Sequence, residues 1–192
     1  MNLDLIPKEW TDLLLKIQTV DPMAIIAGGA LRDLDNDKEV KDLDIFVSCP
    51  DFELKDIIGE CCIDQQAPSD IPDTDIISST VYLVAGITIP VNIVTCAKHE
   101  DFLLQQLNRF DIGICKVGYD GRTFIQTSAY IRDKECKELV IYNSSWMPGS
   151  LARIARIGKK YPNWKQFLNV PTMYPSTEYQ NSTYVELQQH SS

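Results

Sequence analysis

The stretch AIIAGGALRDLDNDKEVKDLDIFV, from Ala24 to Val47, decides the fold of this chain. The apolar run at its start, residues 23–27, predicts a short buried strand, and the Gly28–Gly29 pair that follows predicts a turn. Residues 30–34 are typical of the first turns of a helix. After the polar turn DNDKE, the segment KDLDIFV alternates acidic and apolar residues, which predicts a second strand with its apolar side chains buried.

Two acidic residues of this second strand are expected to share a face. Asp42 and Asp44 are two positions apart, and side chains at that spacing project from the same side of a strand. Two neighbouring carboxylates repel each other, and a divalent cation with oxygen ligands, most simply Mg²⁺, would relieve the repulsion. The Gly28–Gly29 turn supplies backbone that a phosphate can approach closely, with helix N–H groups aimed at it. Alone, each feature is more often a solvated strand edge or an ordinary turn. Their joint order and spacing suggest a nucleoside triphosphate held together with a metal ion.

The stretch resembles the signature of the nucleotidyltransferase superfamily, and especially the head domains of bacterial poly(A) polymerases and tRNA CCA-adding enzymes. Those domains carry a G-G-x-x-R-D helix followed by a D-x-D strand. The matching residues here are Gly28, Gly29, Arg32, Asp33, Asp42 and Asp44. The resemblance implies an α+β fold, a mixed and mostly antiparallel sheet backed by helices, over roughly residues 20–160. It also implies that Gly28, Gly29 and Arg32 bind the nucleotide, and that two metal ions align an in-line transfer.

The superfamily usually supplies a third carboxylate from a neighbouring strand, often written V-E-V. The equivalent run here is PVNIV, residues 90–94, with Asn92 at the acidic position. An amide can ligate a metal through its carbonyl oxygen, but it brings no negative charge and cannot act as a general base. Either the third acid is dispensable, or another acid replaces it, or activity is lost.

Asp111 is the best replacement for the missing acid. It lies in the run RFDI, which resembles the R-R-D-F-T-I-N segment of the same head domains, where the Asp-bearing strand lies beside the metal strand. Arg109 in this run would face the ribose or the phosphates of the nucleotide. The alternative interpretation of Asp111 is a cap at the start of its strand.

Positive charge is concentrated late in the chain. The segment LARIARI resembles the R-L-L-R-A-I-R-F helix of the family. Arg153 and Arg156 are three positions apart and share a helix face, which Lys159 and Lys160 extend. The resemblance implies a clamp on the triphosphate or on an acceptor phosphate. A solvated basic helix face is the alternative.

Length and composition bound the remaining possibilities. The 192 residues, 44% of them hydrophobic, predict one domain over residues 1–165 and a polar tail over residues 166–192 that is partly mobile. A net charge of −9 argues against a broad basic surface, so no duplex DNA partner is expected. The six cysteines form no C-x-x-C pair, which argues against zinc. No signal peptide or membrane span is recognisable, so we expect a cytoplasmic protein without a membrane partner.

The rest of the pattern predicts further elements. We expect a helix over residues 6–19, a loop over residues 60–76, an antiparallel hairpin formed by SSTVYLVAG and ITIPVNIVT, and a strand in DIGICKV at residues 111–117.

Two functional hypotheses follow. The first is a Mg²⁺-dependent nucleotidyltransferase that moves a nucleotide from an NTP, with ATP expected, to a hydroxyl on an RNA end, a protein or a small molecule. The second is a catalytically inactive protein of the same fold that binds a nucleotide or a partner protein. Gly28–Gly29 and Asp42/Asp44 favour the first, and Asn92 favours the second. Because the chain ends soon after the basic helix, we expect no helical neck, body and tail of the tRNA-acting relatives, and no CCA-adding or processive polyadenylating activity.

Overall fold

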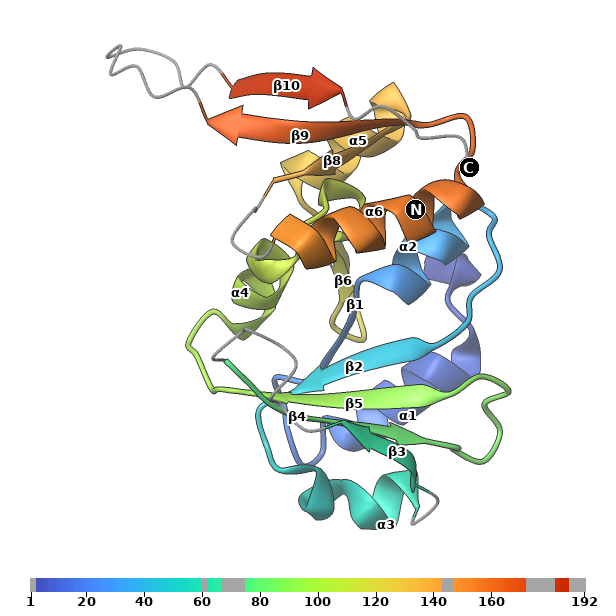
Figure 1. The fold of residues 1–192 in the computed structure, drawn as a ribbon. Helices are drawn as coiled ribbons and strands as arrows, with labels where there is room; N and C mark the ends of the chain where they lie inside the picture. Colours follow the sequence, from blue (N-terminus) through green and yellow to red (C-terminus); the bar gives the residue numbers. More distant parts are fainter. Residues whose placement is uncertain (1–2, 60–61, 67–74, 143–146, 172–181, 187–192) are drawn as a thin grey trace. The chain divides into compact units, whose positions relative to one another are not determined.

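The computed structural model describes residues 3–59, 62–66, 75–142, 147–171 and 182–186 (Figure 1). The chain divides into two compact units, the first formed by residues 1–108 and 117–126 and the second by residues 109–116 and 127–192. The expected division into one domain over residues 1–165 and a tail stays a prediction. None of the helices in the described ranges is long and apolar enough to cross a membrane.

The first unit contains a seven-stranded sheet with the order β3-β4-β5-β2-β1-β6-β7. The strands are β1 (Ile25–Ala27), β2 (Leu43–Val47), β3 (Cys62–Gln66), β4 (Ile76–Tyr82), β5 (Val91–Cys96), β6 (Val117–Tyr119) and β7 (Phe124–Gln126). Only β2 and β5 pair in parallel, and the other five neighbouring pairs are antiparallel. The predicted α+β architecture with a mixed, mostly antiparallel sheet is therefore confirmed, as is the β4–β5 hairpin.

The first unit also contains helical segments, which lie before its first strand and between later strands. They are η1 (Leu3–Leu5), α1 (Lys8–Ile17), α2 (Gly29–Asp35), η2 (Asp51–Leu54), α3 (Lys55–Ile58) and α4 (Phe102–Arg109), whose last residue belongs to the second unit. Helix α1 confirms the helix expected over residues 6–19, and its buried side chains recur at helical spacing: Trp10, Leu13, Leu14 and Ile17.

The alternation of β2 sorts its side chains between the two faces of the sheet. Leu43, Ile45 and Val47 have no exposed surface, as predicted, whereas Asp44 between them is half-buried. Segment η2 is attached to the sheet through Asp51, whose Oδ2 accepts hydrogen bonds from Thr80 Oγ1 at 3.0 Å and from Tyr82 at 3.1 Å.

The second unit contains a three-stranded sheet with the order β10-β9-β8. Its elements are η4 (Gly113–Cys115), α5 (Ser128–Cys136), β8 (Glu138–Ile141), α6 (Met147–Lys160), β9 (Lys165–Pro171) and β10 (Ser182–Glu186). Strands β8 and β9 are parallel, and β9 and β10 are antiparallel. Thr127 caps the start of helix α5, where its side chain accepts a hydrogen bond from the backbone N–H of Tyr130, and Lys137 caps the end of the helix in the left-handed conformation.

Two local predictions differ from the structure. The loop expected over residues 60–76 contains strand β3. Within residues 166–192 the structure describes most of strand β9 and all of β10, and the expected polar, partly mobile tail stays a prediction. These segments can form strands without an apolar period, because strand pairing uses backbone groups that every sequence carries. Residues 67–74, 172–181 and 187–192 lie outside the described residues, so the expected loop and mobile tail are not addressed there.

The strand expected over residues 111–117 is also wrong over most of its length. Its centre is the 3-10 turn η4, and only Val117 belongs to a strand. A Cβ at Gly113 would overlap side-chain atoms of Asp133 and Tyr142, so the backbone packs closely against them. Cys115, which alternation would place on the opposite face, is buried together with Ile112 and Ile114, so the alternation in DIGICKV does not separate a core face from a solvent face.

Candidate nucleotide and metal site

The glycine turn follows β1 in the first unit. Gly28 has φ 84° and ψ −128°, a conformation that side-chain-bearing residues rarely adopt. Its N–H donates to the backbone oxygen of Val117 in β6 at 2.9 Å. Gly29 starts α2, and a Cβ there would stand an ordinary 3.7 Å from Arg32 Nη2. The fold itself therefore requires glycine at position 28, whereas position 29 has room for a side chain.

Arg32 lies in a buried ion pair on α2. Arg32 and Asp33 are only 6% and 2% exposed, and Arg32 Nε donates to Asp33 Oδ1 at 2.7 Å. Since Nη2 is close to Gly29, the guanidinium reaches back to the glycine turn. The ion pair places the Arg32 guanidinium at the turn with its charge balanced by Asp33, and the predicted contact of Arg32 with a nucleotide stays a prediction.

The acidic pair begins the next strand of the sheet. Asp42 is exposed and directly precedes β2, and Asp44 is its second residue. Strand β1 runs antiparallel to β2, with Ile26 opposite Ile45, so the end of β1 lies beside the start of β2. The structure therefore brings the glycine turn and both acids to one end of two neighbouring strands, as the family signature implies.

Asn92 lies directly opposite Asp44 on the parallel strand β5. Asn92 Nδ2 donates to Asp44 Oδ1 at 3.0 Å, and Asn92 Oδ1 accepts a hydrogen bond from Ser79 Oγ at 2.8 Å. An ionised carboxylate only accepts hydrogen bonds, so the amide must turn its NH₂ group toward Asp44. Sequence reasoning identified Asn92 and missed Ser79, whose position beside it depends on the β4–β5 register.

The donor set at this edge fits Mg²⁺. Mg²⁺ in proteins is usually held by one or two carboxylates together with waters and substrate phosphates, and Asp42 and Asp44 supply two carboxylates. Within the described ranges no group of three His, Cys, Asp or Glu side chains could hold a metal ion. The arrangement therefore fits a cation that arrives with a nucleotide better than a cation enclosed by protein ligands alone.

Asp111 belongs to the second unit and is 8% exposed. Its Oδ1 accepts a hydrogen bond from Arg153 Nη1 and its Oδ2 accepts one from Ser150 Oγ, both at 2.6 Å. The backbone oxygen of Asp111 accepts a hydrogen bond from Tyr142 N at 2.7 Å. Both carboxylate oxygens thus accept hydrogen bonds from side chains of helix α6. A catalytic role for Asp111 beside Asp42 and Asp44 stays a prediction.

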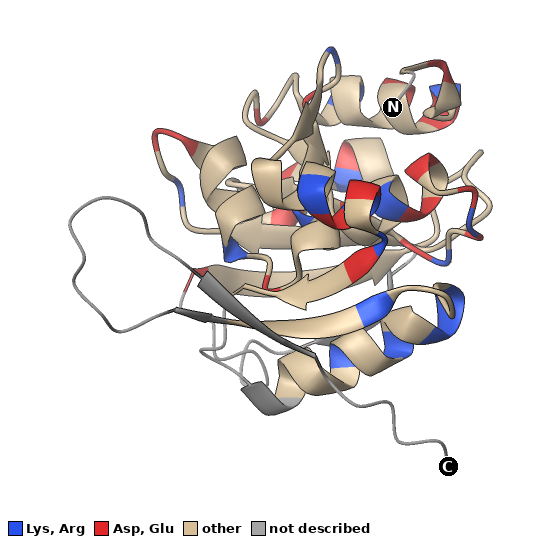
Figure 2. Ribbon diagram, turned by 90° about the horizontal axis from the view of Figure 1, so that it is seen from above, with Lys and Arg blue, Asp and Glu red and all other residues tan. Residues whose placement is uncertain are grey.

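The second unit is also where positive charge accumulates. It holds ten Lys and Arg residues against six Asp and Glu, a net charge of +4 in a chain that carries −9. Figure 2 shows Lys and Arg distributed along α6. Arg156 is exposed and the Arg153 side chain is 39% exposed, while Arg109, at the end of α4, is half-buried. The predicted phosphate contacts of these three arginines stay predictions.

A buried charged cluster in the same unit was not anticipated. Asp133 on α5 has no exposed surface and accepts hydrogen bonds from Tyr142 OH at 3.0 Å, Arg132 Nη1 at 3.0 Å and Val140 N at 3.2 Å. Burial raises the pKa of Asp133 to about 6, although the three donors favour its charged form. Burial also lowers the pKa of Lys116, and the charges of nearby acids, Asp133 among them, act in the opposite direction.

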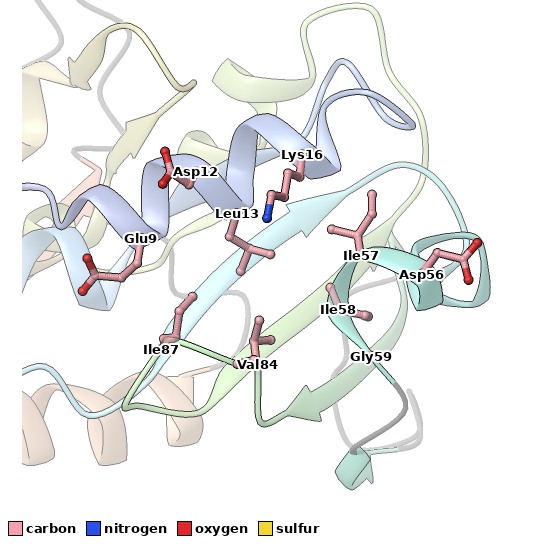
Figure 3. A pocket seen from close by; sticks show the side chains of 11 residues that line it. Glu9, Asp12, Leu13, Lys16, Asp56, Ile57, Ile58, Gly59, Val84 and Ile87 are labelled. Atoms are coloured by element: carbon pink, nitrogen blue, oxygen red, sulfur yellow. The ribbon is translucent and has the colours of Figure 1, made fainter.

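The hollows of the first unit lie elsewhere. A pocket of about 390 Å³ opens between α1, α3 and the β4–β5 connection, with Leu13, Ile58 and Val84 among its lining residues. Figure 3 shows Lys16 reaching into it from α1. A second hollow of about 570 Å³ is lined by residues such as Met23 and Phe102. None of the predicted site residues lines either of these two hollows.

Comparison with known proteins identifies the fold. No family model matches the chain, and no curated protein matches its sequence. Similar solved structures include a CCA-adding enzyme in complex with ATP (16% identity, TM-score 0.63, 88% of this chain and 41% of that chain). A tRNA-processing enzyme in an apo form matches at 19% identity and TM-score 0.60, over 84% of this chain and 44% of the enzyme. The Thermotoga maritima CCA-adding enzyme complexed with tRNA matches at 17% identity and TM-score 0.58, over 81% and 38%.

These similarities define a nucleotidyltransferase-like fold, which confirms the predicted resemblance. The chain spans less than half the length of each of these enzymes. At such low sequence identity the similarity establishes the fold alone, and any activity has to be argued from the residues of this chain.

Proposed function

We propose that this chain is a Mg²⁺-dependent nucleotidyltransferase that moves a nucleotide from an NTP, with ATP the expected donor, to a hydroxyl on an RNA end, a protein or a small molecule. The observation that carries the proposal is the placement of the Gly28–Gly29 turn and of Asp42 and Asp44 at one end of β1 and β2. The proposal is supported by solved structures of this fold that contain ATP, CTP or tRNA.

Each residue has a distinct role in this proposal. Asp42 and Asp44 would hold Mg²⁺, which supplies a positive charge that aligns the triphosphate and favours attack by the acceptor oxygen. Gly29 lets a phosphate approach the backbone, and the Arg32 guanidinium beside it adds positive charge. Arg109, Arg153 and Arg156 would bind phosphates of the nucleotide or of the acceptor. Asp111 would be the third catalytic carboxylate, whereas the metal ligands would be Asp42 and Asp44.

A catalytically inactive protein that binds a nucleotide or a partner protein is the second candidate, and Asn92 favours it. The amide beside Asp44 removes one negative charge from the place where the superfamily usually has a carboxylate. Binding of a Mg²⁺–nucleotide complex needs only the two acids, whereas deprotonation of an acceptor hydroxyl benefits from a base.

Label transfer tests the proposal. The protein is incubated with each labelled NTP, Mg²⁺ and total RNA or cell lysate, and transfer should occur with the wild type and be lost in Asp42→Asn and Asp44→Asn. Asp37→Asn is the matched control because Asp37 is an exposed acid of the same connection, in a left-handed conformation that Asn tolerates. NTP binding without transfer would support the second candidate, and absence of any NTP binding would overturn the first candidate and the nucleotide-binding form of the second.

A cytoplasmic location is part of the proposal. It is supported by four described cysteines that are not joined in disulfides, namely Cys49, Cys96, Cys115 and Cys136. Burial, together with the nearby charges of Asp21 and Glu53, raises the pKa of Cys49 to about 11, which keeps it an unreactive thiol near neutral pH.

A further inference from the structure

A chain of side-chain hydrogen bonds crosses three neighbouring strands and ends at Asp44. Ser79 on β4 donates to Asn92 on β5, which donates to Asp44 on β2. The registers explain this line of contacts. Asn92 is paired with Asp44, and Ser79 is paired with Val94, two residues beyond Asn92 and on the same face. Ser79 is 7% exposed, so its hydroxyl lies inside the protein.

Both ends of the Asn92 amide are used by this chain. Its carbonyl oxygen faces Ser79 and its NH₂ group faces Asp44. To ligate a cation beside Asp44, the amide would have to turn its oxygen toward the carboxylate. That rotation would place two acceptors against each other and would break both hydrogen bonds. Asn92 therefore acts on Asp44 and is not itself a ligand.

The charge of the site then limits how many cations it holds. Asp42 and Asp44 together carry two negative charges, which balance one divalent ion. A second cation would lie roughly 3.5–4 Å from the first in a two-metal site, and the repulsion between them requires further anionic ligands. On the neighbouring strand β5, the position opposite Asp44 holds the neutral amide of Asn92 instead of a carboxylate.

We propose that the first unit is a single-cation site, in which Ser79 orients Asn92 and Asn92 holds the Asp44 carboxylate in its ligating position. Ser79 is thus a positioning residue, and Asn92 sets the number of cations. This inference rests on the proposed function because it takes Asp42 and Asp44 as the ligands.

Ion counting with Mn²⁺ alone as the probe tests the number of cations. The full chain is titrated with Mn²⁺, and bound ions are counted from the loss of the free-ion electron paramagnetic resonance signal. The wild type should bind one ion and Asn92→Asp should bind two. Two ions on the wild type, or a single ion on Asn92→Asp, would overturn the inference. Failure of the wild type to bind Mn²⁺, or unchanged binding in Asp42→Asn and Asp44→Asn, would instead refute the metal site of the proposed function.

The role of Ser79 has its own readout in the same titration. Ser79→Ala should weaken Mn²⁺ binding about tenfold without changing the ion count, and Ser79→Thr, which keeps the hydroxyl, should restore it. Thr80→Ala is the matched control, because Thr80 is the next residue on β4, projects from the opposite face and donates to Asp51. Wild-type affinity in a folded Ser79→Ala variant would refute the positioning role. If that variant does not fold, weakened binding in Ser79→Thr refutes it equally.

Discussion

Asp133 is expected to make the stability of the protein depend on pH in a direction opposite to that of most carboxylates. Its side chain has no exposed surface, and its pKa rises from an ordinary 3.8 to about 6 because burial disfavours the charged form. The folded protein therefore keeps the proton at pH values where the unfolded chain has lost it. The stabilising contribution is complete below the unfolded pKa and is lost as pH rises through the folded pKa.

The size of the effect follows from the two pKa values. Each pH unit of difference corresponds to about 1.4 kcal/mol, and the unfolded carboxyl is already partly ionised at pH 4, so raising the pH from 4 to 7 should remove about 2 kcal/mol of stability through Asp133. Other groups titrate over the same range. The measured quantity is therefore the difference in unfolding free energy between the wild type and Asp133→Asn, in which the side chain is neutral at every pH.

Urea unfolding monitored by circular dichroism at pH 4, 5, 6 and 7 provides this difference. The wild type should lose stability relative to Asp133→Asn across the series, with most of the loss complete by pH 7. Glu135→Gln changes an exposed acid on the same helix and should follow the wild-type profile. A difference that stays constant with pH, or that moves toward greater wild-type stability, would show that Arg132 and Tyr142 hold the carboxylate as an anion despite its burial.

Two further predictions use the same unfolding assay together with calorimetry. Gly28→Ala should cost about 1–3 kcal/mol because of its backbone conformation, whereas Gly29→Ala should leave stability unchanged and weaken ATP binding; unaltered affinity in Gly29→Ala would show that the turn contacts no phosphate. Asp111→Ala should lower the unfolding free energy by about 2 kcal/mol through the loss of its bonds to α6. Unchanged stability combined with lost Mg²⁺ binding would make Asp111 a metal ligand instead.

Local pattern predicted the centre of the first unit well. The apolar run, the two glycines and the alternation around Asp44 each reflect a constraint that acts within a few residues, so β1, α2 and β2 lie where the sequence indicates. Contacts between distant segments are not visible in any local sequence pattern. No spacing rule links Asp111 with Ser150, or Ser79 with Asn92, because these pairs depend on strand register and helix placement.

The alternation of residue types also gave a wrong prediction where both faces of the segment are buried. Alternation predicts a strand only when one face meets solvent, and residues 112–115 are buried on all sides. The polar strands β3 and β10 were not predicted for a different reason. Backbone pairing does not require apolar side chains, so these strands carry no apolar pattern.

The uneven division of charge has a consequence for how a polyanion would meet this protein. The first unit carries −13 and the second +4, so the net charge of −9 describes neither. At low ionic strength the field of the acidic unit extends tens of ångströms and would slow the approach of RNA, whereas at physiological salt it is screened beyond about 8 Å. Association should therefore accelerate with the first additions of salt and weaken only at higher concentrations, when the contacts of the basic residues are themselves screened. On an ion-exchange column the protein would behave as an anion, although its second unit carries a net positive charge.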